Sequence, residues 1–333
     1  MRSRIFALIL VLGLSLLPGA ADRAFAAGQK LIIYTSMKES LIGGIVEGFV
    51  KKYPGTSVDY QSAGAGKLMA KIAAERESGK ILADIIWTSE VPDFYNMKNE
   101  GLLEQYRTPL FNEILNPFDD YDGFFTAARL GTLGIAINTD LIKTPPAQWS
   151  DLFKPEFKGA FGIADPALSG TAYMSVALLE KQFGWEFFEK LRANQARIGK
   201  GSGQVVDDTA SGELSASLAV DYITNDKIAK GAHLSLIYPP ELLMAPSPAA
   251  IFKNSPNLDA AKNFVDYLLS HDAQVLIAAE GTLSVRTDVA NLPAHKLPPA
   301  ADALQRAIKI DYLQMMATKE ATIKKFTGTL QGK

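Results

Sequence analysis

The chain has 333 residues, of which 47% are hydrophobic and 21% are charged, and its formal net charge is −2. This balance argues against a strongly basic surface, so neither nucleic acid nor an anionic membrane is expected as a partner. Because the sequence contains no cysteine, disulfides, thiol nucleophiles and lipid-modified cysteines are excluded as well.

The first 26 residues have the pattern of a cleavable secretory signal. Arg2 and Arg4 form a short positive region, residues 5–17 are apolar, and Ala24 and Ala26 supply small residues for cleavage. The apolar run is shorter than the roughly 20 residues that a permanent membrane helix needs. We therefore expect residues 1–26 to be a signal peptide and the mature protein to be exported.

Short apolar strands then alternate with amphipathic helices. Strands are predicted over residues 30–35, 57–60 and 83–88, and helices over 40–53, 66–77 and around 94–97. Apolar, β-branched strands separated by helices are typical of a parallel sheet that is covered on both faces. The pattern predicts an α/β fold.

A second unit of the same kind follows residues 130–138. Strands are predicted over 159–165 and near 213–222, and helices over 171–183 and 186–194. Prolines at 239–240 and 246–248 mark a return to the first unit, where helices over 259–270, 272–280 and 301–327 are expected to pack. We predict two lobes, each a largely parallel sheet flanked by helices. Lobe 1 comprises residues 27–133 and 246–333, and lobe 2 comprises residues 134–245.

Two predicted helix starts are made of small and hydroxyl-bearing residues. One follows the second strand and the other follows the strand near residue 165. Small residues let a ligand approach the unpaired N–H groups of the first helical turn, where the helix dipole favours an anion. Both could instead be ordinary N-caps that touch no ligand. The candidate residues are Ser62, Gly64, Ala65 and Gly66 at the first start, and Ser169, Gly170 and Thr171 at the second.

Other candidate binding residues follow predicted strands at the same edge of the sheet, where ligands of open α/β folds bind. Each could also be a simple turn residue. These candidates are Ser36 and Met37 after the first strand, Thr88 and Ser89 after the third, Gln204 in a Gly-Ser loop, and Asp221 and Tyr222 at a later strand end.

Catalytic and metal-binding patterns are missing from the sequence. The three histidines, His233, His271 and His295, are far apart and form no metal-binding spacing. No G-x-S-x-G elbow and no P-loop is present. We expect no enzymatic activity and no resident cofactor.

Several stretches resemble the type II periplasmic solute-binding proteins of ABC transporters, in the branch that binds ferric iron, phosphonates or sugar phosphates. They cover most of the mature chain in order: 31–36 (LIIYTS), 49–75, 83–106 (beginning ADIIWTSEVPDF), 131–142 (GTLGIAINTDLI), 149–173 and 257–281.

The resemblance implies two lobes that close on a solute by bending near residues 130–138 and 243–247, and a closed form that docks on an ABC permease. It implies a monomer that captures a small anionic solute, a phosphonate or a phosphorylated organic molecule. Ferric iron is the alternative ligand, and Tyr222 would then bind it. Iron-binding members have two consecutive tyrosines at this place, whereas Tyr222 is followed by Ile223. An exported hydrolase or a sensor partner is the alternative from another functional class.

Overall fold

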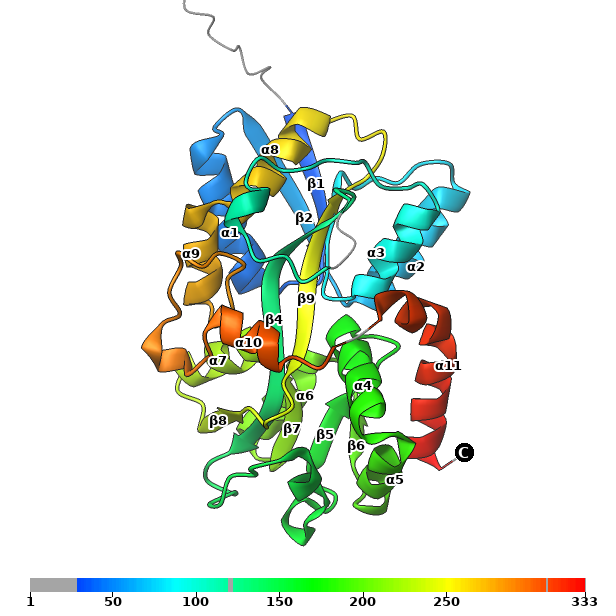
Figure 1. The fold of residues 1–333 in the computed structure, drawn as a ribbon, viewed down its shortest axis with the longest axis vertical. Helices are drawn as coiled ribbons and strands as arrows, with labels where there is room; N and C mark the ends of the chain where they lie inside the picture. The colour runs from blue at the N-terminus through cyan, green and yellow to red at the C-terminus, as the bar shows by residue number, and fades with distance from the viewer. Residues whose placement is uncertain (1–28, 119–121, 310, 333) are drawn as a thin grey trace, which may run out of the picture.

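The computed structural model describes residues 29–118, 122–309 and 311–332, and a sheet of nine strands runs through this part of the chain (Figure 1). The strand order is β2-β1-β3-β9-β4-β7-β5-β6, with β8 paired to β4. The expected signal peptide lies outside the described residues. The strands are β1 (Gln29–Thr35), β2 (Thr56–Ser62), β3 (Ile85–Trp87), β4 (Thr126–Asn138), β5 (Phe161–Ala164), β6 (Arg197–Gly199), β7 (Ala216–Val220), β8 (Leu234–Ile237) and β9 (Leu243–Ile251).

Each half of the molecule contains a parallel set of strands. In the half that we call lobe 1, β1 pairs in parallel with β2 and β3. In the other half, lobe 2, β5 pairs in parallel with β6 and β7. The strands between these sets, β9, β4 and β8, pair in the antiparallel sense. The α/β class with two lobes is confirmed, but the sheet as a whole is mixed, because a chain that crosses to lobe 2 and returns must run in both directions.

The long strands β4 and β9 connect the two lobes. They pair with each other from Thr126 and Ala249 to Leu133 and Leu243. Beyond this point β4 continues into lobe 2 and pairs with β7 and β8. Every residue of both strands is buried. These two strands occupy the places where the sequence predicts a hinge.

Helices flank the sheet in both lobes. In lobe 1, α1, α8 and α9 lie on one side and α2 and α3 on the other (Figure 1). The apolar residues of α1 form a single buried face, and its Phe49 packs edge-on against Phe264 of α8 at a centroid distance of 5.0 Å. The helices are α1 (Glu39–Lys52), α2 (Ala65–Glu77), α3 (Val91–Asn99), α4 (Gly170–Phe183), α5 (Trp185–Ala193), α6 (Ser202–Ser211), α7 (Asp221–Ala229), α8 (Leu258–Leu269), α9 (His271–Ala279), α10 (Ala300–Arg306) and α11 (Tyr312–Gln331).

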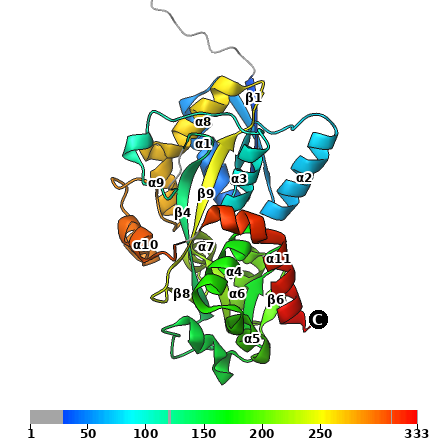
Figure 2. The same ribbon diagram turned by 45° about the vertical axis from the view of Figure 1, so that its right-hand side comes forward.

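The last helix, α11, contacts both lobes (Figure 2). The sequence predicts that this segment packs on lobe 1, and Tyr312 does stack on Tyr95 of α3 there, at 6.1 Å. However, Phe326 packs on Phe188 of α5 in lobe 2, at 5.4 Å. The predicted contact with lobe 1 is therefore only part of the packing, because apolar residues of α11 pack against both lobes. None of the described helices has the length and apolar character needed to cross a membrane.

Candidate functional site

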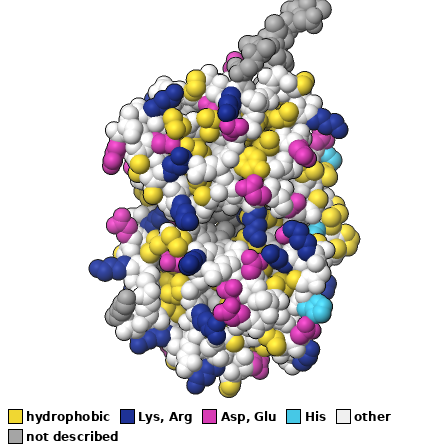
Figure 3. All heavy atoms as spheres, turned by 180° about the vertical axis from the view of Figure 1, so that it is seen from behind, with side chains coloured by type: hydrophobic (Ala, Val, Ile, Leu, Met, Phe, Trp, Pro, Cys, Tyr) yellow, Lys and Arg dark blue, Asp and Glu magenta, His cyan; other side chains and the backbone are white. Residues whose placement is uncertain are grey.

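A cavity of about 260 Å³ lies between the lobes. Lobe 1 contributes the segments that follow β1, β2 and β3, and lobe 2 contributes the starts of α4, α6 and α7. On the face seen in Figure 3, the surface is hollowed between the lobes, and Lys and Arg side chains gather around the hollow. Ligands of open α/β sheets bind beyond the carboxyl ends of the strands, so this cavity is the candidate site.

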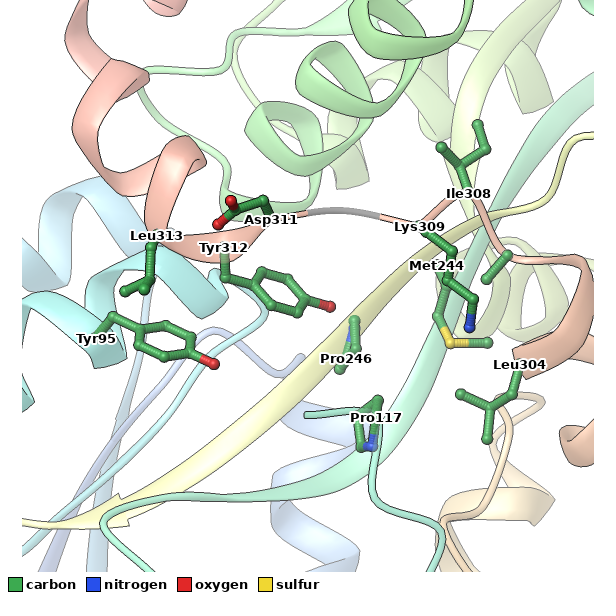
Figure 4. Close-up of a pocket in the computed structure, with 11 residues that line it drawn as sticks. Tyr95, Pro117, Met244, Pro246, Leu304, Ile308, Lys309, Asp311, Tyr312 and Leu313 are labelled. Atoms are coloured by element: carbon green, nitrogen blue, oxygen red, sulfur yellow. The ribbon is translucent and has the colours of Figure 1, made fainter. Parts of the chain in front are cut away.

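A second cavity, of about 420 Å³, lies under the segment that joins α10 to α11 (Figure 4). Met244 and Pro246 of β9 line it, with Tyr95 and Tyr312 at one end. Its lining is mainly aliphatic, aromatic and proline side chains. We assign the ligand to the interlobe cavity because helix starts and unpaired cationic groups converge there.

Three hydroxyl groups form a hydrogen-bonded triangle on the lobe 2 wall of the interlobe cavity. Ser202 Oγ lies 2.8 Å from both Ser169 Oγ and Thr171 Oγ1, which are themselves 3.1 Å apart. Ser169 is the N-cap of α4 and Ser202 is the first residue of α6. A hydroxyl rotates freely and can donate or accept. This hydroxyl triangle can therefore turn donors toward the oxygen atoms of a bound anion.

The starts of α2 and α4 add backbone donors. Gly64 and Ala65 line the cavity at the start of α2, and Ser169 and Gly170 line it at the start of α4. The first N–H groups of a helix have no carbonyl partner within the helix, and the aligned peptide dipoles place partial positive charge there. Both helix starts therefore favour a negative group in the cavity.

The cavity is lined by three lysines and by no aspartate or glutamate. Lys38 and Lys67 belong to lobe 1, and Lys200 belongs to lobe 2. Among the described residues, none of the three forms an ion pair. Burial lowers the pKa of Lys38, although the nearby Asp207 carboxylate opposes this shift. The cavity is therefore strongly cationic.

The structure represents a closed arrangement of the lobes. At Gly64 and Gly66 of lobe 1, an added Cβ atom would lie 2.4 Å from the carbonyl oxygen of Leu168 and 2.3 Å from that of Ala167, respectively. Both carbonyl groups belong to lobe 2. Only glycine allows the two backbones to approach this closely, so these glycines let the lobes meet beside the cavity.

A buried ion pair lies behind the cavity wall. The side chains of Arg129 and Asp221 have no exposed surface, and Arg129 Nη1 lies 3.3 Å from Asp221 Oδ1. The Asp221 carboxylate also accepts hydrogen bonds from Thr132 and Thr282. The Arg129 guanidinium stacks on the Tyr222 ring at 4.6 Å. Tyr222 is thus held from behind while it lines the cavity.

The structure brings together nine of the fourteen residues that the sequence indicates for the site. They come from six different strand ends or helix starts, as expected from the edge of an open sheet. The nine residues that line the cavity are Ser36, Ser62, Gly64, Ala65, Ser89, Ser169, Gly170, Thr171 and Tyr222.

The other five do not line the cavity, for separate reasons. Met37 and Thr88 are completely buried, and Gly66 lies against the Ala167 carbonyl instead. The Gln204 side chain accepts a hydrogen bond from the Lys200 N–H at 2.9 Å, so it stabilises the turn over residues 200–204 instead of facing the cavity. Asp221 begins α7 instead of ending a strand, and its carboxylate forms an ion pair with Arg129.

Sequence reasoning missed the residues that contribute most charge, which are Lys38, Lys67 and Lys200, together with Ser202. A signal was present in the sequence. Lys38 precedes α1, Lys67 is in the first turn of α2, and Lys200 and Ser202 flank the start of α6. Cationic residues beside helix starts add to the dipole in attracting anions.

The cavity residues do not fit ferric iron. Tyr222 is the one tyrosine in the lining, and no carboxylate or histidine accompanies it. Burial raises the pKa of Tyr222, which keeps its phenol protonated at neutral pH. Its Oη accepts a hydrogen bond from the Lys38 N–H at 3.3 Å. Three lysines in the same cavity would repel a trivalent cation.

Comparisons with known proteins identify the family of the chain. The family model for bacterial extracellular solute-binding proteins matches residues 80–314. An uncharacterised protein of Haemophilus influenzae is 28% identical over 312 residues and covers 88% of each chain. A Salmonella typhimurium protein, provisionally named a 2-aminoethylphosphonate-binding periplasmic protein, is 24% identical and covers 73% of this chain and 74% of its own.

Solved structures show the same fold. The periplasmic binding protein AfuA from Actinobacillus pleuropneumoniae, with fructose 6-phosphate bound, has a TM-score of 0.81 at 25% identity, covering 92% of this chain and 99% of its own. Iron-bound HitA from Pseudomonas aeruginosa has a TM-score of 0.75 at 22% identity, covering 91% and 99%, and this likeness concerns the fold alone. The chain belongs to the bacterial extracellular solute-binding protein family, and it is a periplasmic substrate-binding protein of an ABC transporter and not an enzyme.

Proposed function

We propose that the interlobe cavity captures a small anionic solute that carries a phosphoryl group, either a phosphonate or a phosphorylated organic molecule. The observation that carries this proposal is the cavity lining itself. Three lysines that form no ion pair with any other described residue, together with the hydroxyl triangle, surround a space whose described lining contains no carboxylate. Phosphoryl oxygens accept several hydrogen bonds and bear up to two charges near neutral pH, which matches this lining.

The ligand is expected to hold the lobes together. The walls of the cavity belong to different lobes, so a solute that contacts both of them stabilises the closed form over the open form. The lobe boundaries predicted at residues 133/134 and 245/246 fall within β4 and β9. We propose that these strands bend there, and that the closed monomer then delivers the solute to its permease.

Two relatives support the phosphoryl assignment. One is provisionally named for 2-aminoethylphosphonate, and another has fructose 6-phosphate bound. We also propose that residues 1–26 direct the chain across the inner membrane and are then removed by cleavage, because a periplasmic location requires this transport.

Thermal unfolding of the mature protein tests the proposal directly. The protein should first be unfolded and refolded to remove any ligand from the expression host. In large excess, at least one phosphoryl compound from a panel that includes fructose 6-phosphate and 2-aminoethylphosphonate should raise the Tm, whereas fructose should not. A ligand at about 1,000 times its Kd stabilises the folded state by about 4 kcal/mol. A Tm that rises with ferric salts and with no phosphoryl compound would refute the proposal.

The hydroxyl triangle gives a matched test by mutation. Ser202→Ala removes one donor and should weaken phosphoryl binding by about tenfold, equivalent to about 1.4 kcal/mol. Ser211→Ala, at the exposed far end of the same helix, should leave the affinity unchanged. Isothermal titration with the ligand that gives the largest Tm shift measures both. Equal affinities for the two variants would mean that the hydroxyl triangle does not bind the ligand.

A further inference from the structure

The described lining of the cavity offers no carboxylate to a positively charged group on the ligand. Three acidic side chains close to it already have partners. Glu90, which lies against Gly170, pairs with Lys319. Asp221 pairs with Arg129, and Asp207, whose charge also acts on Lys38, pairs with Lys227. A ligand ammonium group would therefore meet three lysines and no carboxylate in this lining.

The positive charge of the cavity is also larger than the negative charge of one phosphoryl group. Lys38, Lys67 and Lys200 carry three positive charges between them, whereas a phosphoryl group bears between one and a half and two negative charges near neutral pH. Lys38 is partly buried, whereas Lys67 and Lys200 remain exposed to solvent. A second anionic group on the solute would find a lysine without an ion-pair partner among the described residues, and its charge would be attracted there.

The three lysines differ in what lies beside them. Lys200 lies two residues before Ser202, and Lys38 Cε reaches Gly203, whose added Cβ would be 3.4 Å away. Both are therefore beside the hydroxyl triangle, at the start of α6. Lys67 belongs to α2 in the opposite lobe. The phosphoryl group belongs at the triangle, and Lys67 is left for another group.

We infer that the solute carries a second anionic group besides its phosphoryl group, that Lys67 receives this second group, and that the site rejects solutes with an ammonium group. This inference rests on the proposed function and deepens it, because it separates ligands that all contain a phosphoryl group. It runs against 2-aminoethylphosphonate as the preferred ligand, although a relative is named for that compound.

Three phosphonates of similar size test the charge preference. They are 2-carboxyethylphosphonate, propylphosphonate and 2-aminoethylphosphonate, which differ mainly in an anionic, a neutral or a cationic end. Titration of the refolded mature protein at pH 7.5 should give affinities in that order, with the carboxylate at least about tenfold tighter than the neutral compound. If the amine binds tightest, or if the carboxylate and the neutral compound bind equally, the inference fails while the proposed function stands. If none of the three binds and no phosphoryl compound raises the Tm, the proposed function itself fails.

Variants of two lysines test the role of Lys67. Lys67→Gln should lower the affinity for 2-carboxyethylphosphonate by about tenfold and leave that for propylphosphonate within about twofold. Lys80→Gln removes one charge from an exposed site outside the cavity and should change neither value. An equal loss for both ligands in Lys67→Gln would show that Lys67 serves the phosphoryl group, and would overturn its assignment.

Discussion

Arg129 and Asp221 are enclosed by protein on all sides, and they connect the two lobes behind the wall of the interlobe cavity. Arg129 is on β4, Asp221 starts α7, and Arg129 also donates hydrogen bonds to Ser89 and Thr282. A buried charge without its partner is strongly unfavourable, since water no longer solvates it. The pair therefore holds the cavity floor and Tyr222 in one arrangement.

Asp221→Asn keeps the shape of the side chain but leaves the Arg129 charge without a counter-ion. We expect the free energy of unfolding to fall by about 3–5 kcal/mol. Asp207→Asn removes an exposed partner of Lys227 and should cost less than about 1 kcal/mol. Urea denaturation of the ligand-free proteins measures both changes. Similar urea midpoints for the two variants would mean that the buried pair contributes little.

This residue pair also shows where single-sequence reasoning stops. In the sequence Arg129 comes just before the apolar run over residues 130–138, and nothing near it marks it as a buried strand residue. Its partner is 92 residues away, so the contact exists only once β4 and α7 are packed together. For the same reason Asp221 was predicted to bind the ligand, whereas it binds Arg129.

At the scale of elements, the starts of α2 and α4 line the cavity and are also the places where the two lobes meet. Local patterns predicted the starts of α2 and α4, because small residues after a strand are visible in a short window of sequence. The start of α6 could be placed beside α4 only by the fold, since Ser202 reaches Ser169 across 33 residues. The sequence therefore predicted two members of the hydroxyl triangle, Ser169 and Thr171, and missed the third, Ser202.

The Gly66→Ala variant should impair closure of the two lobes without impairing folding. An added Cβ would meet the Ala167 carbonyl oxygen at 2.3 Å when the lobes are closed, and the open form is free of this clash. Alanine also favours the helix by up to about 1 kcal/mol over glycine. We expect an unchanged or higher Tm without ligand, together with an affinity for the phosphoryl ligand reduced by at least about tenfold.

Gly44→Ala is the matched control for this glycine. Gly44 lies within α1, and its Cβ position has no neighbour within 4 Å. This variant should gain helix stability without losing affinity, as measured by the same titration. Normal affinity in Gly66→Ala would mean that the lobes do not approach there in the bound state.

At the scale of the whole molecule, α11 links the two lobes through a buried ionic cluster. Lys319 of α11 pairs with Glu90 and with Asp93, the latter at 2.6 Å, at the start of α3 in lobe 1. On the lobe 2 side, Tyr173 of α4 donates a hydrogen bond to the Met315 carbonyl at 2.6 Å. Periodicity predicted a helix here but could not show that its polar residue Lys319 would become half-buried against Glu90 and Asp93.

This cluster should make stability depend on pH. Burial, and then the nearby Asp93, raise the pKa of Glu90 from 4.5 to about 7. Burial also raises the pKa of Asp93. One lysine faces two carboxylates, so the folded protein favours a proton on the cluster. Between pH 4.5 and about 7 the folded state binds a proton that the unfolded state has released, and this contribution to stability is therefore lost as the pH rises through that range.

Glu90→Gln removes the surplus carboxylate and leaves Lys319 paired with Asp93. The stability of this variant relative to the unmodified protein should therefore be more favourable at pH 8 than at pH 5.5, as measured by urea denaturation. Glu100→Gln, an exposed partner of Arg76, serves as the control and should show the same small difference at both pH values. If Glu90→Gln also shows no change between pH 5.5 and pH 8, Glu90 is ionised throughout this range in the folded protein. The cluster would then hold the lobes together as a permanent ion pair, with no dependence on protonation.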